Sequence, residues 1–176
     1  MANTFELIAS STVGASSVSS IDFTSIPSTF TDIVLKMSLR TDRSAVPDQA
    51  KITFNGSTSS YSGMIILGTG SSVISETNSA AGAGSGYLIG ENINGASSTS
   101  STFSNGEFYI PNYAGSTNKS ISMDLVMENN ATAGYQSLTA GLWSNTSAIT
   151  SIKLQSANGF NFVQYSTAYL YGVSNA

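Results

Sequence analysis

The sequence contains no cysteine and no histidine. Without cysteine the chain has no disulfides, no thiolate metal ligands and no cysteine nucleophile, so its fold must rest on packing and backbone hydrogen bonds. Without histidine it lacks the commonest general base, the usual partner of a catalytic serine and the commonest transition-metal ligand. The two absences favour a protein that binds another molecule without catalysing a reaction.

Charge is also scarce. Charged residues make up 9% of the chain, compared with about 25% in ordinary soluble domains. Six Lys and Arg residues against ten Asp and Glu residues give a formal net charge of -4. Binding to a phosphate backbone requires clustered Lys and Arg, and the sequence contains no such cluster. We therefore expect no nucleic-acid partner.

Long apolar runs are missing too. The run from Met64 to Leu67 has only the length of a strand, whereas a membrane-spanning helix needs about 20 apolar residues. Residues Met1 to Glu6 have neither the basic region nor the apolar region of a signal peptide. We expect no membrane partner and synthesis in a cytoplasm, where a chain without cysteine folds unaided.

Serine, threonine, asparagine and glycine take the place of the missing charges. Their hydroxyls and amides keep a surface soluble without long flexible side chains. Short side chains also lose little conformational entropy when they are pressed against another surface. This composition indicates a stable extracellular or virion surface.

Apolar and polar residues alternate with a period of two in two long stretches, from Asp32 to Thr41 and from Lys119 to Glu128. The residues on the apolar faces are Ile33, Leu35, Met37 and Leu39 in the first stretch and Ile121, Met123, Leu125 and Met127 in the second. This spacing predicts half-buried strands of antiparallel sheets.

Weaker alternation separated by Asn-Gly and similar turns predicts further strands. Their ranges are Thr4 to Ala9, Ser16 to Phe23, Ala50 to Asn55, Tyr61 to Leu67, Gly86 to Ile93, Gly106 to Pro111, Tyr135 to Trp143, Ile149 to Gln155 and Phe162 to Gly172. One helical turn is expected between Asp22 and Phe30, and mobile loops at Asn78 to Ser85 and Gly95 to Thr102. The pattern predicts a single all-β domain over residues 1–176, an antiparallel β-sandwich of jelly-roll type with about 8 to 11 short strands.

The polar residues form no recognisable catalytic or metal-binding motif. A glycosidase needs two facing carboxylates among clustered aromatic and acidic residues, and no such cluster is visible. The loop that holds Asp42 and Asp48 lacks the EF-hand pattern, and Arg43 makes it a surface turn with local ion pairing. The Gly-rich stretches lack the Lys-Ser or Lys-Thr pair of a P-loop. We expect no enzymatic activity, no cofactor and no metal.

Aromatic residues are the best candidates for contact with a partner, because exposed Trp and Tyr rings form both sugar-stacking platforms and protein hot spots. Trp143 is the strongest candidate, since it lies on the opposite face of its strand from Leu138, Ala140 and Leu142. The other candidate interface residues are Tyr109, Tyr113 and Phe5. The tyrosines of the last strand, Tyr165, Tyr169 and Tyr171, have the alternative role of closing one end of the sandwich.

Four segments of the sequence resemble segments of small Ser/Thr/Gly-rich virion proteins of tailed bacteriophages, including cyanophages and marine phages. The segments are Ser25 to Asp32, Ile110 to Lys119, Ala140 to Ile149 and Gln164 to Gly172, and the similarity extends from about Phe5 to Gly172. The resemblance implies a virion structural protein with a jelly-roll-like sandwich, which serves as a capsid decoration (cement) protein or as part of a head or tail fibre. It transfers no functional residue.

A compact, acidic chain without a repetitive shaft favours a decoration protein on the capsid exterior. Such a protein binds the major capsid protein in many copies and associates by symmetry, with a homotrimer favoured. Residues Met1 to Phe5 are then a candidate N-terminal arm that adds a strand to a neighbour's sheet. The alternative is a receptor- or glycan-binding module of a head or tail fibre, with exposed aromatics in a shallow groove.

Overall fold

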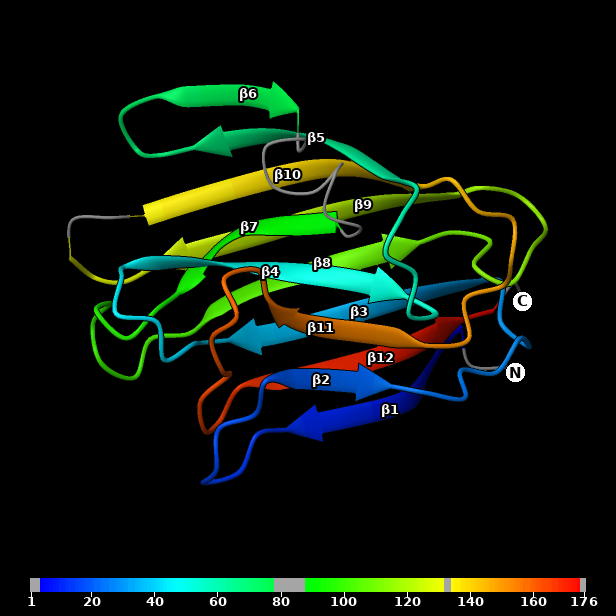
Figure 1. Cartoon of the computed structure of the whole chain (residues 1–176), viewed down its shortest axis with the longest axis horizontal. Helices are drawn as coiled ribbons and strands as arrows, with labels where there is room; N and C mark the ends of the chain where they lie inside the picture. Colours follow the sequence, from blue (N-terminus) through cyan, green and yellow to red (C-terminus); the bar gives the residue numbers. More distant parts are fainter. Residues whose placement is uncertain (1–3, 78–87, 132–133, 175–176) are drawn as a thin grey trace.

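The computed structural model describes residues 4–77, 88–131 and 134–174 and shows an all-β chain (Figure 1). The strands in chain order are β1 (Phe5–Thr12), β2 (Ser20–Phe23), β3 (Asp32–Leu39), β4 (Pro47–Phe54), β5 (Tyr61–Gly68), β6 (Val73–Thr77), β7 (Leu88–Asn94), β8 (Ser104–Ile110), β9 (Lys119–Glu128), β10 (Gly134–Trp143), β11 (Ile152–Ser156) and β12 (Thr167–Val173). No helix that could cross a bilayer occurs in the described ranges.

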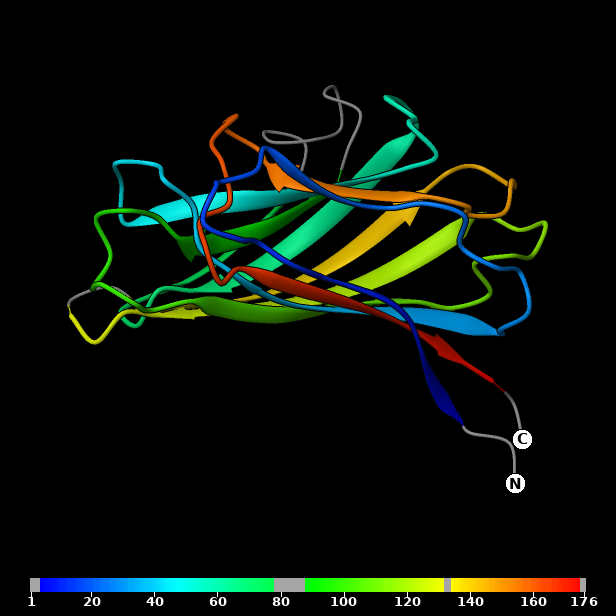
Figure 2. The same ribbon diagram turned by 90° about the horizontal axis from the view of Figure 1, so that it is seen from below.

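The strands form two antiparallel sheets that pack against each other. The larger has eight strands in the order β1-β12-β3-β8-β9-β10-β5-β6, and the smaller has four in the order β2-β11-β4-β7. Figure 2 shows the two sheets edge-on as separate layers, with the two termini side by side at one end. The β-sandwich predicted from the alternation is confirmed, whereas its jelly-roll topology stays a prediction.

The core lies between the sheets and includes the residues that the alternation of β3 and β9 predicted. On β3 and β9 the buried residues include Leu35 and Leu125, at 0% and 1% exposure. The smaller sheet contributes Phe54, Ile152 and Leu154 from the facing side, all at 1% exposure or less. An antiparallel sheet with one covered face produces this alternation, because successive side chains point to opposite faces.

The helical turn expected between Asp22 and Phe30 does not form, and this prediction is wrong. The segment is an irregular loop with bends, tied by hydrogen bonds from Ile26 N to Thr150 O (3.0 Å) and from Thr31 N to Val173 O (2.9 Å). The Phe30 ring packs where a Cβ on Gly172 would lie, 2.3 Å from it. These tertiary contacts outweigh the weak local preference for a turn of helix.

Every range predicted as a strand overlaps an observed strand, and β6 is the strand that the sequence analysis missed. All five of its residues are exposed, from Val73 to Thr77, so neither face carries a buried stripe that would mark it. Its backbone pairing with β5 holds it in place. Because β6 is the last strand of the larger sheet, its other edge has no strand beside it among the described residues.

The loop from Gly95 to Thr102 folds around the side chain of Arg40, which follows β3 and is 9% exposed. The guanidinium donates from Nη1 to Thr99 O (2.8 Å) and Thr102 O (2.9 Å) and from Nη2 to Ala96 O (3.2 Å) and Ser98 O (2.9 Å). The backbone of this loop is therefore anchored by Arg40, while small side chains such as Ala96, Ser97 and Thr99 are exposed. Its predicted mobility stays a prediction. The other predicted loop, Asn78 to Ser85, lies outside the described residues.

A second buried cation holds the loop at the opposite end of the larger sheet. Lys119, the first residue of β9, is 0% exposed, and its Nζ donates to Gly115 O (2.7 Å) and to Thr117 O. Burial lowers the pKa of both Arg40 and Lys119 from their ordinary values. In each case main-chain carbonyls, rather than carboxylates, compensate the charge.

Replacing Arg40 with Met is expected to lower the free energy of unfolding by about 3 kcal/mol, because four carbonyls of the loop lose their donor. The Met side chain keeps the apolar stem, so packing along it changes little. Urea unfolding measures the loss. Lys153→Met removes a cation whose side chain is 46% exposed and ion-paired with Asp22, and we expect it to cost less than about 0.5 kcal/mol. Equal effects of the two substitutions would contradict the role of Arg40.

Candidate functional site

The eight-stranded sheet has one face that no described element covers. We call the side that points away from the four-stranded sheet the outer face (Figure 2). Side-chain alternation places residues such as Lys36, Asp124 and Leu138 on it, because their neighbours in sequence point into the core. The outer face is the largest regular surface of the molecule that is open to a partner.

Strand register joins the outer face into one continuous surface. Its central row runs across seven strands, each residue directly opposite the next, in the order Tyr169, Lys36, Glu107, Asp124, Leu138, Ile66 and Ser75. Cross-strand partners hold their Cβ atoms about 4.5–5.5 Å apart. Side chains of the row therefore touch their neighbours from β12 to β6, although they are far apart in the sequence.

Exposed apolar side chains gather on the outer face. Eight of the eleven large apolar residues that are exposed in the described ranges lie on it, and they are Phe5, Leu7, Met64, Ile66, Val73, Val126, Leu138 and Tyr169. We define the aliphatic patch as Met64, Ile66, Val73, Val126 and Leu138. Ile66 and Leu138 are 53% and 57% exposed and directly opposite each other. A contiguous group of this kind marks an interaction surface more often than single exposed residues do.

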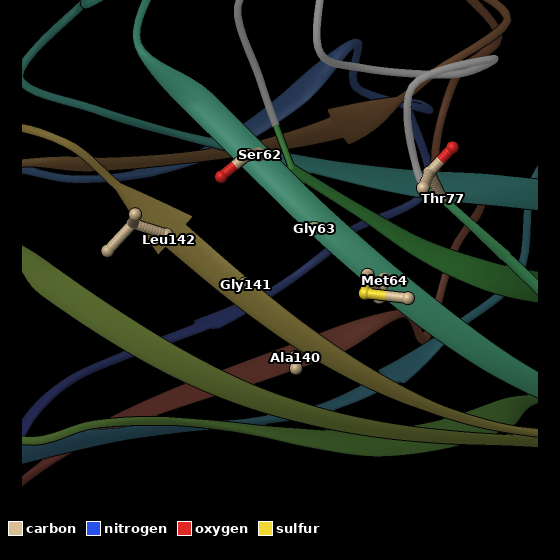
Figure 3. Close-up of a pocket in the computed structure, with 7 residues that line it drawn as sticks. All are labelled: Ser62, Gly63, Met64, Thr77, Ala140, Gly141 and Leu142. Carbon is tan, nitrogen blue, oxygen red and sulfur yellow. The ribbon is translucent and has the colours of Figure 1, made fainter.

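A shallow depression of about 580 Å³ adjoins the aliphatic patch (Figure 3). Its floor is the backbone of Gly63 and Gly141, which are paired in register on β5 and β10. Met64 and Leu142 stand on either side of the two glycines. The depression is open and largely apolar, so it fits a protruding side chain of a partner better than a small molecule that must be enclosed.

Charged side chains occupy the centre of the outer face. Lys36 forms an exposed ion pair with Glu107, and this hydrogen bond raises the pKa of Lys36. The neighbouring Asp124 accepts a hydrogen bond from Glu107 N at 2.9 Å through Oδ1. Of the ion pairs formed by the described residues, none includes Asp124.

Two of the four predicted interface residues lie on the outer face. Phe5 is 54% exposed on β1, with its ring 6.5 Å from that of Tyr171 in an edge-on arrangement. Tyr109 is half-buried on β8 and donates from its hydroxyl to Asp32 Oδ2 at 2.6 Å. That hydrogen bond, together with burial, raises the pKa of Tyr109.

The other two predicted residues, Trp143 and Tyr113, are buried at 1% and 0% exposure and so contact no partner. The Trp143 ring lies 5.5 Å from Phe54 and 6.1 Å from Tyr61, while the Tyr113 hydroxyl donates to Pro27 O. Tyr113 lies in the loop after β8. Trp143 is buried because β10 turns Ser137, Thr139 and Trp143 inward and Leu138 outward. The alternation was read correctly in that strand, but the wrong face was assigned to the core.

The prediction of a free N-terminal arm over residues Met1 to Phe5 is wrong in part. Phe5 pairs with Val173 inside the chain's own sheet, and Ser174 N donates to Thr4 O at 3.0 Å. These residues are therefore not a free arm. Residues 1–3 lie outside the described part of the chain.

Met64, Ile66 and Leu138 are the residues that sequence reasoning missed. The run from Met64 to Leu67 is apolar at every position, so both faces of β5 carry large apolar side chains. That run is the one signal that could have pointed to an apolar outer face. The alternation of β10 alone gives no such signal, because it does not say which of its faces is buried.

The buried Asp48 has a structural role, since polar side chains surround its carboxylate. Asp48 is 0% exposed and accepts hydrogen bonds from Ser156 Oγ (2.8 Å) and Asn158 Nδ2 (2.7 Å), with Arg43 Nη1 at 3.6 Å. The ion pair of Arg43 is thus with Asp48 rather than with Asp42. No group of three or more Asp or Glu side chains that could hold a metal ion is found within the described ranges.

No protein-family model, no curated protein and no solved structure matches the chain. The fold defines its class as an antiparallel β-sandwich with an eight-stranded and a four-stranded sheet. Among the described surfaces, the outer face is the one whose exposed side chains point to a binding role.

Replacing Trp143 with Ala is expected to lower the free energy of unfolding by about 3–5 kcal/mol, because a large buried ring is lost. Trp143→Phe should cost less, since it keeps an aromatic ring beside Phe54 and Tyr61. The chain has a single Trp, so native wild-type fluorescence should be blue-shifted and move to longer wavelength on unfolding in urea. A control, Tyr165→Ala, removes a residue that is 68% exposed. A red-shifted native emission would contradict the burial of Trp143.

Alkaline pH is expected to destabilise the native state above the ordinary tyrosine pKa of 10.0. Burial raises the pKa of Tyr61 and Tyr113, and the bond to Asp32 raises that of Tyr109. The neutral hydroxyls therefore stabilise the fold fully below pH 10, and this contribution is lost as the pH rises through the raised values. Absorbance at the phenolate band should show Tyr61, Tyr109 and Tyr113 ionising late. In Tyr109→Phe one late ionisation should disappear; simultaneous ionisation of all tyrosines would contradict the structure.

Proposed function

We propose that this chain is a non-enzymatic structural protein of a bacteriophage virion, a capsid decoration protein that binds the exterior of the major capsid shell through its outer face. The observation that carries the proposal is the gathering of exposed apolar side chains on one uncovered sheet face. A monomer in water does not benefit from such a surface, whereas a protein that docks by it does. The assignment to a bacteriophage virion rests on the sequence resemblance.

The size of the outer face suits a protein partner. Eight strands spaced about 4.8 Å apart and about eight residues long give a face of roughly 34 Å by 26 Å. Its footprint, on the order of 900 Å², is comparable to the roughly 800 Å² that each partner buries in a standard protein interface. A flat face of this extent fits a shell of regularly arranged subunits better than it fits a small ligand.

The composition of the face also supports binding to protein. Tyrosine, phenylalanine and methionine are enriched in interfaces, and Phe5, Tyr169 and Met64 are exposed here. Backbone pairing within the sheet fixes these side chains in advance, so less entropy is lost on docking. The alternative of a glycan-binding fibre module loses its strongest stacking ring, because Trp143 is buried.

The first experiment measures copy number. In particles purified from the phage that encodes the chain, gel densitometry against the major capsid protein is expected to give on the order of hundreds of copies, as shell symmetry requires. A tail or fibre component would be present in tens of copies or fewer. Such a low number would overturn the decoration proposal.

The second experiment tests the face itself. The double variant Ile66→Thr/Leu138→Thr removes the two facing aliphatic side chains but keeps strand propensity, so its fold should survive. Added to particles that lack the chain, it should bind at least about tenfold more weakly than the wild type. Tyr165→Ser is the matched control, because Tyr165 is exposed but lies outside the outer face. Equal occupancy by all three proteins would overturn the assignment of the face.

A further inference from the structure

The outer face carries most of the net negative charge of the molecule. Its acidic residues are Asp32, Glu107, Asp124 and Glu128, as their positions on β3, β8 and β9 show. Of the six basic residues, all of which lie in the described ranges, Lys36 alone is on this face. Arg40 and Lys119 are buried, and the remaining three lie on the four-stranded sheet or in the loop before it. The face therefore has one cation against four carboxylates.

Two of these carboxylates stand at the centre, beside the aliphatic patch. Glu107 and Asp124 are cross-strand neighbours on β8 and β9, and Leu138 is the next residue of the row after Asp124. Glu107 is paired with Lys36, whereas Asp124 has the Glu107 amide as a partner but no cation within ion-pair distance among the described residues. Docking on the aliphatic patch would take Asp124 out of water. Its charge helps to raise the pKa of the nearby Lys36, but without an ion pair of its own the buried carboxylate would oppose binding.

This charge pattern decides between the partners that the face could bind. A second copy of the chain, docked face to face by a two-fold axis, would bring eight carboxylates and two lysines together. Like charges that face each other across an interface cost several kcal/mol. A nucleic acid or an anionic lipid surface is repelled for the same reason. A protein surface with exposed Lys or Arg among apolar residues complements the face in both charge and polarity.

We propose that the partner surface on the capsid shell presents a Lys or Arg side chain to Asp124 and Glu107, surrounded by apolar residues that cover the aliphatic patch. This inference rests on the proposed function, because it takes the outer face as the docking face. Aliphatic side chains around the ion pair exclude water and so strengthen it. Arg fits the arrangement best, since its planar fork donates to two carboxylates at once. Self-association of the chain, if it occurs, must then use another surface.

The test uses Asp124→Asn and Asp124→Lys, with purified particles that lack the chain as the probe. Asn is isosteric and keeps the acceptor for the Glu107 amide, so the fold is preserved; thermal unfolding checks this. We expect binding to weaken about tenfold in the Asn variant and at least about a hundredfold in the Lys variant. The control is Asp22→Asn, which makes the same charge change on β2 of the other sheet and should bind like the wild type.

Salt gives an independent readout. Wild-type affinity should fall between about 50 and 500 mM NaCl, and the fall should be smaller in Asp124→Asn, since the screened ion pair is already absent. The Ile66→Thr/Leu138→Thr variant could lose binding while the Asp124 variants and salt have no effect. That result would overturn the proposal of a Lys or Arg on the partner surface but would support the outer face as the docking face. If neither set of variants changes binding, both proposals fail. Tighter binding by Asp124→Lys would overturn the basic partner directly.

Discussion

One packing constraint determines the rest of this structure: an eight-stranded sheet is covered on one face by a sheet of four strands. Side chains alternate between the two faces of each strand, so a central strand such as β9 contributes half of its residues to the core and half to a face that no described element covers. The inner half explains the burial of Leu35, Leu125 and Trp143. The outer half explains why aliphatic residues such as Ile66 and Leu138 face solvent in a monomer. The candidate docking face is thus a direct product of the unequal sizes of the two sheets.

A chain without cysteine and with few charges must secure its connecting loops in another way. Two buried cations serve this purpose, Arg40 at one end of the larger sheet and Lys119 at the other. Arg40 donates to four main-chain carbonyls of the loop from Gly95 to Thr102, and Lys119 donates to two in the loop before β9. Both loops contain Ser, Thr, Gly and Ala. Small side chains allow the backbone to approach the cation closely. The same small residues that leave the surface nearly uncharged therefore make this kind of anchoring possible.

The sequence was more informative about where strands lie than about which face of each strand is buried. The alternation in Asp32 to Leu39 and in Lys119 to Glu128 located two central strands and their buried residues correctly, because one side of each is consistently apolar. In β10 the same pattern led to the opposite of the true orientation, since the inward residues Ser137 and Thr139 are polar and Leu138 points outward. β6 has no buried side chain at all, so no pattern could reveal it. Trp143 was proposed as a contact because it lies opposite Leu138, Ala140 and Leu142, and it is buried because that opposite face of β10 is the covered one.

The sequence by itself determined that this protein is all-β, contains no cysteine or histidine, and is poor in charge and rich in hydroxyl groups, because composition and period-two alternation are local properties. Only the tertiary structure decided which side of each strand is covered. That choice depends on which strands become neighbours and where the four-stranded sheet lies over them. It placed Lys36, Glu107, Asp124, Leu138 and Ile66 side by side from five different strands. The face through which we propose the protein binds is therefore a property of strand register, which no single segment of the chain encodes.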